Sequence, residues 1–205
     1  GTTKTHSRQT CSDTERAYFN ATYYSRTVVA SVAGSGNFCQ KFQRIEDVTR
    51  LAGKNVMLSF WARADTTRNI AIEFLQNFGT GGSPSPEVTG IASQLVPLTS
   101  SWQKFEIPIT IPSIAGKTLG TDGVKTSYTR VTFWFDAGND YNARTANLGQ
   151  QSGTFDIAQV QIEEGTIATP FEMRPLGLEQ ILCYRYYQSL YIRYFTAVLY
   201  SPNGD

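Results

Sequence analysis

The stretch VMLSFWARADTTRNIAIEFLQN, residues 56–77, decides the fold class of this 205-residue chain. Apolar residues recur at every second position in both halves of the stretch. They are Val56, Leu58 and Phe60 in the first half and Ile70, Ile72 and Phe74 in the second. This period is typical of β-strands that turn one face to a core. The polar residues between the two runs are too few for a helix, so the stretch predicts two antiparallel strands joined by a turn.

The same alternation continues along the chain. It recurs at Phe105, Ile107, Ile109 and Ile111 and at Val131, Phe133 and Phe135, with weaker runs at 24–32, 37–47, 92–99 and 153–164. About eight strands without interleaved helices predict an all-β fold, an antiparallel β-sandwich of the jelly-roll kind. Pro108 and Pro112 cannot donate ladder hydrogen bonds, so we expect their strand at a sheet edge or paired on one side.

The run GTFDIAQVQIEEG, residues 153–165, changes phase within one strand. Phe155 and Ile157 share one phase, whereas Ala158, Val160 and Ile162 share the other. A β-bulge near Ile157 would turn both sets inward. Alternatively, both faces of this strand are covered, one by the second sheet and one by a helix or a neighbouring subunit.

The pattern changes after this strand, in EEGTIATPFEMRPLGLEQILCYRYYQSLY, residues 163–191. Leu178, Leu182 and Tyr186 repeat at the four-residue spacing of a helix face, and Pro175 suits a first helical turn. We expect this short helix to bury that face against the sandwich or an adjacent subunit, and of these we favour an oligomer interface. A β-like C-terminal segment follows it. The expected organisation is a lead-in segment 1–23, a jelly-roll domain 24–170, a connector with the helix 171–188, and a tail or following segment 189–205.

The charge and the cysteine content narrow the partners and the compartment. The net charge is +1 and basic residues are not clustered, so we expect neither nucleic-acid binding nor an anionic membrane surface as a partner. No apolar stretch is long enough to predict membrane insertion. The three cysteines, Cys11, Cys39 and Cys183, leave at least one free thiol and favour synthesis in a reducing cytoplasm. Whether Cys11 and Cys39 pair stays open.

Catalytic constellations are poorly represented. His6 is the only histidine and lies in a polar segment, which leaves little basis for a Ser-His-Asp triad, a Cys-His pair or a histidine-ligated zinc ion. Carboxylates such as Glu163, Glu164 and Asp136 fit strand ends and turns. The Gly-rich stretch 76–88 lacks the ending of a phosphate-binding loop and fits either a binding loop or an ordinary connector. We therefore expect no enzyme.

Aromatic residues on outward phases or in loops are candidates for stacking on sugar rings. Trp134, Tyr128 and Tyr141 are the candidates here. A ring on a strand with two apolar faces also suits a core or a subunit interface, so both roles stay open for these three residues.

Several stretches together resemble a domain of bacteriophage tail fibres and virion spikes, which itself resembles jelly-roll carbohydrate-binding modules. They are RIEDVTRLAGKNVMLSFWARAD, IAIEFLQNFGTGGSPSPEV, TSSWQKFEIPITIPSIAGKTLG and FDIAQVQIEEGTIATPFEMRPLGLEQILCYRYYQ. The resemblance covers roughly residues 24–188. Its last stretch is the most specific, because it joins a strand, an EEG turn, ATPFE, RP and a helix ending in CYRYYQ.

The resemblance implies a non-enzymatic virion component, a homotrimer located near the tip that meets the host, together with other tail or spike proteins. A host-surface glycan is the candidate ligand. The resemblance also implies a structural calcium ion held in part by Asp156, although Ile157 stands where the modules usually have a second acidic residue. The alternatives are a structural trimerising fibre domain without a ligand and a carbohydrate-binding module of a cellular enzyme. The host, the receptor and the extent of the parent polypeptide stay open.

Overall fold

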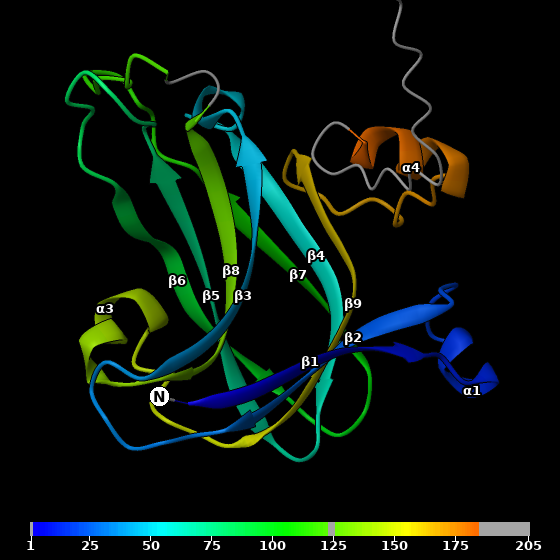
Figure 1. Cartoon of the computed structure of the whole chain (residues 1–205). Coiled ribbons are helices and arrows are strands. Elements are labelled where there is room, and N and C mark those ends of the chain that lie inside the picture. The colour runs from blue at the N-terminus through cyan, green and yellow to red at the C-terminus, as the bar shows by residue number, and fades with distance from the viewer. Residues whose placement is uncertain (1, 123–125, 185–205) are drawn as a thin grey trace, which may run out of the picture. The chain divides into compact units, whose positions relative to one another are not determined.

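The computed structural model describes residues 2–122 and 126–184, and nearly half of this part is β-strand (Figure 1). Its strands are β1 (Thr3–Thr10), β2 (Tyr23–Ala30), β3 (Phe38–Glu46), β4 (Asn55–Ala64), β5 (Arg68–Asn77), β6 (Val88–Leu98), β7 (Gln103–Thr110), β8 (Tyr128–Ala137) and β9 (Gly153–Glu164). Its helices are α1 (Asp13–Arg16), α3 (Asn142–Thr145) and α4 (Leu176–Cys183), with 3₁₀ turns η1 (Val48–Arg50) and η2 (Asn139–Tyr141).

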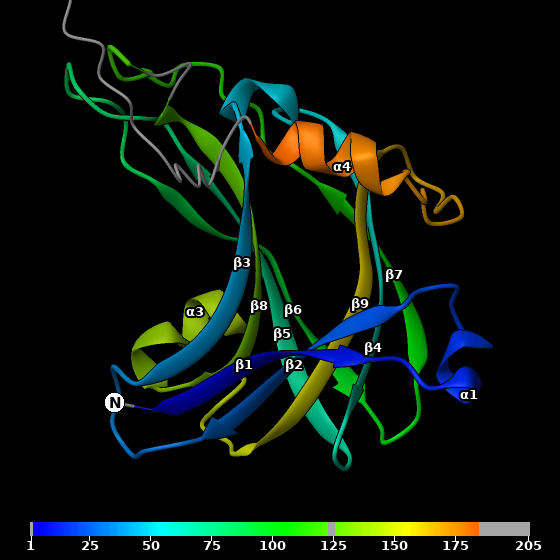
Figure 2. The ribbon, with the colours of Figure 1, turned by 45° about the vertical axis from the view of Figure 1, so that its right-hand side comes forward.

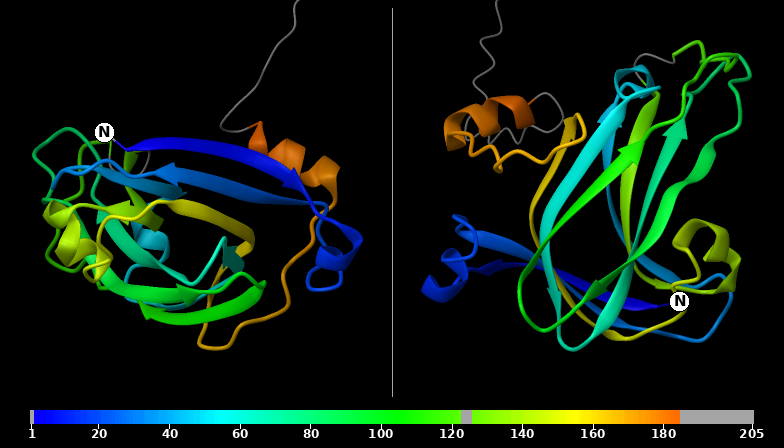
Figure 3. Two further views of the ribbon diagram at one scale, coloured as in Figure 1. Left: turned by 90° about the horizontal axis from the view of Figure 1, so that it is seen from below. Right: turned by 180° about the vertical axis from the view of Figure 1, so that it is seen from behind.

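The strands form two antiparallel sheets that face each other (Figures 1 and 3). One sheet has the order β1-β2-β9-β4-β7 and the other the order β3-β8-β5-β6. The predicted antiparallel β-sandwich is therefore confirmed. The main core lies between the sheets and contains the alternating apolar residues of β4, β5 and β8, including Val56, Ile70 and Phe133.

The strand that carries Pro108 is β7, which lies at the edge of the five-stranded sheet next to β4. In this position the missing N–H of proline removes no ladder bond on the open side. The expectation of an edge strand is confirmed. Gln76 uses the carbonyl of Pro112 as a hydrogen-bond acceptor at 2.9 Å, which ties the end of this strand to the opposite sheet.

A β-bulge interrupts β9, as the phase change predicts. The register against β4 shifts between Ser59 and Trp61, where Gln161 and Ala158 are the partners on β9. Gln159 occupies the left-handed region with φ 49° and takes up the extra residue. Ile157 therefore faces the main core before the bulge and Ile162 packs against the same core after it. Ala158 belongs to a separate cluster on the outer face, so part of that face is covered as well.

The first residues of the chain belong to the sheet, which corrects the expected boundary at residue 24. β1 pairs with β2 along its whole length, and α1 lies at the far end of this pair (Figure 2). The polar sequence of β1 hides the strand because it is an edge strand with mostly exposed side chains. The short helix α1 begins with a capping box between Ser12 and Glu15. Four-residue helices such as α1 and α3 are too short to show a helical period, so the sequence does not predict them.

The chain divides into two compact units, residues 1–171 with the sandwich and residues 172–205 with α4. The predicted helix exists, and it carries Leu178 and Leu182 with exposed side chains. Tyr186 lies outside the described residues. Among the described helices, none is both long and apolar enough to cross a membrane.

Candidate functional site

The outward face of β8 holds the predicted aromatic residues. Tyr128, Arg130, Thr132 and Trp134 alternate with the core residues of β8 and so share its outer face. Strand β3 lies alongside β8 (Figure 1) and adds its own outward side chains. The ladder pairs are Glu46 with Tyr128, Arg44 with Arg130, Phe42 with Thr132 and Gln40 with Trp134.

The structure gives Trp134 the core role, one of the two that the sequence left open, and so removes it from the candidate sugar-stacking rings. Only 1% of Trp134 is exposed. Its indole N–H donates to Glu73 Oε2 at 3.0 Å, and the rings of Phe38 and Tyr141 pack against it. Tyr141 is held in the same cluster by Phe38, with ring centres 4.9 Å apart. Both rings therefore stabilise one end of the sheet.

Glu73 is the buried charge beneath that cluster. Arg144 donates to both of its carboxylate oxygens, at 2.7 and 3.0 Å, and the backbone N–H of Gly90 donates at 2.8 Å. Together with the Trp134 indole, these donors satisfy a charge that would otherwise be costly inside the protein. This group is structural.

Tyr128 stands at the more open end of the same face. The Arg44 guanidinium lies 4.5 Å from the centre of its ring, a cation–π contact. The guanidinium of Arg130 lies 4.9 Å from the centre of the Phe42 ring. Phe42 keeps 45% of its surface exposed. Two rings and two guanidinium groups thus share one surface.

The base of this surface contains polar atoms without partners. Gln40 Oε1, Arg130 Nε and Thr132 Oγ1 are buried and have no hydrogen-bond partner among the described residues. Burial lowers the pKa of Arg130, and the nearby charge of Arg144 lowers it further. Buried polar groups are normally satisfied, so donors and acceptors left free on one face point to a polar ligand. We call these six residues the sheet patch: Gln40, Phe42, Arg44, Tyr128, Arg130 and Thr132.

Of the six residues of the sheet patch, the sequence predicts only Tyr128 as a binding residue. Tyr128 was predicted because it lies on the outward phase of a strong alternating run. Phe42 lies in a weaker run, and β3 has an irregularity between Cys39 and Gln40 that obscures its phase. Nothing in the sequence marks Arg44 and Arg130 as binding residues, because single basic residues are common on exposed faces.

Asp156 has a different role from the calcium ligand that the resemblance implies. Its two carboxylate oxygens accept hydrogen bonds from Arg26 at 2.7 and 2.8 Å and from Arg63 at 2.9 Å. These guanidinium groups supply the positive charge that a cation would supply. No group of three or more His, Cys, Asp or Glu side chains in the described ranges could hold a metal ion. The residues do not fit a calcium site.

Cys11 and Cys39 are free thiols in the structure, which answers the open question of their pairing. Cys39 belongs to the main core and Cys11 to the outer cluster with Phe19 and Trp102. Burial raises the pKa of both thiols. Cys183 is also free, and it is exposed.

The Gly-rich loop between β5 and β6 is tied to a second loop. Phe78 accepts a backbone hydrogen bond from Gly120 at 2.8 Å, and Ser85 donates to Thr118 at 2.9 Å. These bonds give the loop a structural role as a connector at one end of the sandwich, and its side chains are not part of the sheet patch.

No family model matches this sequence. No curated protein matches it either. Solved structures with a similar arrangement include the xylan-binding domain of a Paenibacillus barcinonensis protein, at 16% identity and a TM-score of 0.46, covering 80% of this chain and 91% of that one. A family 11 carbohydrate-binding module from Clostridium thermocellum, solved with a mixed-linked tetrasaccharide, has 12% identity and a TM-score of 0.45, with coverages of 82% and 90%.

A phage protein is also similar. The enzymatically active domain of tailspike protein 4 of bacteriophage CBA120 has 15% identity and a TM-score of 0.43. The match covers 80% of this chain and 18% of the tailspike chain.

Proposed function

We propose that this protein is a glycan-binding domain that binds sugars through the sheet patch. The exposed ring of Phe42, flanked by the guanidinium groups of Arg44 and Arg130, carries the proposal. A pyranose ring has apolar faces that stack on aromatic rings and hydroxyl groups that accept hydrogen bonds from arginine.

The wider role that we propose is host attachment, as part of a virion tail fibre or spike. The order of motifs in residues 153–188 supports this role, because it resembles fibre and spike domains. In this role the protein binds and does not catalyse. It works as a homotrimer in the virion, together with other tail proteins, and a glycan of the host surface is its ligand.

Screening the whole chain on a glycan array, followed by calorimetry of the best ligand, tests the proposal. Replacing Phe42 by Ala removes the stacking surface, and we expect the affinity to fall about tenfold. Arg44→Gln removes donors and lowers the affinity by a similar factor. The matched control is Tyr18→Ala, which removes an exposed ring just after α1, outside the sheet patch, and should leave the affinity unchanged.

An array without any bound glycan contradicts the proposed ligand class. Equal affinities of the wild type and Phe42→Ala contradict the proposed site. A second candidate function is a structural trimerising domain, and one observation favours it. Leu178, Ile181 and Leu182 of α4 are exposed apolar side chains in the single chain, as residues of an oligomer interface would be.

A further inference from the structure

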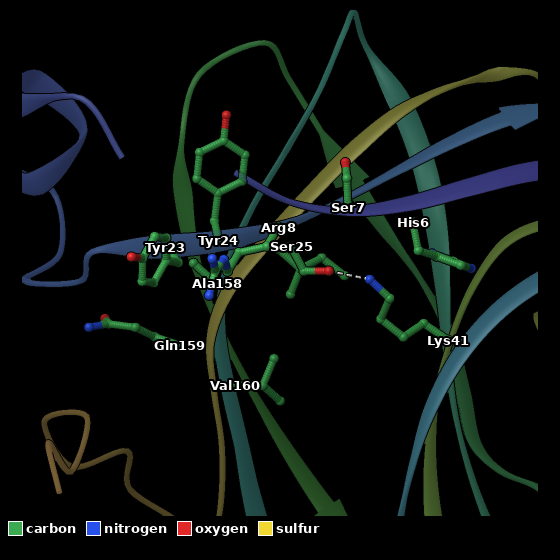
Figure 4. A pocket seen from close by; sticks show the side chains of 11 residues that line it. His6, Ser7, Arg8, Tyr23, Tyr24, Ser25, Lys41, Ala158, Gln159 and Val160 are labelled. Atoms are coloured by element: carbon green, nitrogen blue, oxygen red, sulfur yellow. Dashed lines mark hydrogen bonds between the residues drawn. The ribbon is translucent and has the colours of Figure 1, made fainter. Parts of the chain in front are cut away.

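A cavity of about 590 Å³ lies at one open edge of the sandwich, away from the sheet patch. Strands β1, β2 and β9 of one sheet line it, and Lys41 of β3 reaches it from the other sheet. Figure 4 shows Tyr24 and Ser7 pointing away from Lys41 and Val160, as alternation along the strands requires. We call this space the edge cavity. Its volume is in the range of pockets that hold small molecules.

The charge of the edge cavity is one-sided. His6, Arg8 and Lys41 line it, whereas no Asp or Glu does. The salt bridges found between described residues include neither Arg8 nor Lys41. Two cations and an imidazole therefore face a common space without a carboxylate. Such a space attracts anions.

Lys41 is the most informative of these groups, because it is half-buried. Its ammonium donates a hydrogen bond to the hydroxyl of Ser25 (Figure 4). Burial lowers the pKa of Lys41. Keeping a partly desolvated ammonium without a counter-charge costs free energy, and a bound anion would offset that cost.

His6 lies close to the same positive charges. Its Nδ1 lies 3.0 Å from Thr27 Oγ1. Burial lowers the pKa of His6, and the charges of Lys41 and Lys4 lower it further. A neutral imidazole next to two ammonium groups adds hydrogen-bonding capacity without adding a third charge.

The other residues that line the edge cavity suit the ring of a sugar. Tyr23 is 47% exposed, and the Arg8 guanidinium lies 4.3 Å from the centre of its ring. The bulge of β9 places Gln159, with its left-handed backbone, in the lining next to the exposed Val160. Backbone strain of this kind gathers at binding sites, where it aims a side chain. An exposed ring, an amide and an apolar wall fit the faces and hydroxyl groups of a sugar.

We propose that the edge cavity is a second binding site, which takes a sugar that carries an anionic group. Lys41 and Arg8 attract the carboxylate or phosphate group, and the sugar ring lies against Tyr23. This site is separate from the sheet patch. Lys41 lies on the face of β3 opposite to Gln40 and Phe42, and the other lining residues belong to β1, β2 and β9 of the five-stranded sheet.

Titrations of the whole ¹⁵N-labelled chain followed by NMR test the proposal with four probes: glucuronate, glucose 6-phosphate, glucose and inorganic phosphate. We expect one of the charged sugars to shift the amide signals of His6, Tyr23 and Gln159 and to bind at least about tenfold more tightly than glucose. The charged sugar that binds more tightly identifies the anionic group. Glucose binding as tightly as both charged sugars overturns the proposal, and so does inorganic phosphate binding as tightly as the better charged sugar.

Variants locate the site. Lys41→Gln and Arg8→Gln should each weaken binding of the charged sugar at least about fivefold, and Tyr23→Ala should weaken it as well. Arg8 is exposed, so its substitution tests the charge without disturbing a packed region. Lys117→Gln, on a distant exposed loop, is the matched control and should change nothing. Unchanged affinity in both Arg8→Gln and Lys41→Gln overturns the proposal. Phe42→Ala should leave this binding intact, which separates this result from the test of the sheet patch.

Discussion

Among single residues, Asp156 shows most clearly how a charge is stabilised in this sandwich. Its side chain is almost fully buried, and Arg26 and Arg63 neutralise it from two neighbouring strands. Arg63 also contacts Glu15 at 2.7 Å, which links α1 to the sheet. A single carboxylate thus joins β9, β2, β4 and, through Arg63, the first helix.

Replacing Asp156 by Asn should lower the free energy of unfolding by about 2–3 kcal/mol, because it leaves two guanidinium groups without their counter-charge. Chemical denaturation measures the change. The matched control is Glu106→Gln, which breaks the exposed pair with Lys104 and should cost less than about 0.5 kcal/mol.

The same residue tests the role of calcium. We expect neither EDTA nor added calcium to move the melting temperature of the wild type. A calcium-dependent rise that disappears in Asp156→Asn would show that this carboxylate binds the ion after all.

The sequence predicts which face of a strand is buried, but it does not predict which side chains pair or pack on the outer face. The alternation of Val131, Phe133 and Phe135 predicted a buried face correctly, since burial on one side of a strand follows directly from its period. The same reasoning could not separate Trp134, which is buried, from Phe42, which is exposed, because both stand on outer faces. What covers an outer face depends on loops and short helices that have no period.

Among the strands, β9 connects the fold most directly to the proposed site in the edge cavity. Its bulge was predictable, because the apolar phase changes within one uninterrupted run. The phase change placed the bulge near Ile157, two residues from Gln159. The left-handed backbone of Gln159 was not predictable, since glutamine carries no turn signal such as glycine or asparagine. The left-handed backbone at Gln159 lowers the free energy of unfolding, because a side chain with a Cβ is strained there and a glycine is not.

Gln159→Gly should raise the free energy of unfolding by about 0.5–1 kcal/mol, because glycine adopts the left-handed region without strain. The same substitution should weaken ligand binding in the edge cavity, since it removes an amide from the lining.

Gln161→Gly is the matched control, because the backbone of Gln161 is not left-handed. It should destabilise the strand by a similar amount. Denaturation curves in which both variants lose stability would contradict the assignment of strain to residue 159.

For the molecule as a whole, the fold class followed from the sequence, whereas the assembly is a proposal. The sequence predicts the helix and its apolar positions, and in the described residues Leu178 and Leu182 are exposed. An exposed apolar helix face is favourable only when something covers it.

Native mass spectrometry of the chain should show a trimer, and the double change of Leu178 and Leu182 to Ser should shift it to monomers, because the interface loses its apolar area. Val28→Ser, which changes an exposed apolar residue of β2, is the control and should leave the trimer intact. A monomeric wild type would contradict the proposed assembly directly.

The alternation of β8 has an evolutionary consequence. Positions 131, 133 and 135 face the core, whereas Tyr128 and Arg130 point outward and belong to the sheet patch. Neighbouring positions of β8 are therefore selected for different properties, the core positions for stability and the patch positions for binding. In the proposed glycan-binding role, mutations at the patch positions would change the glycan that is bound, while the core residues beside them keep the chain folded. A lineage could then exchange one ligand for another in single steps without losing its scaffold.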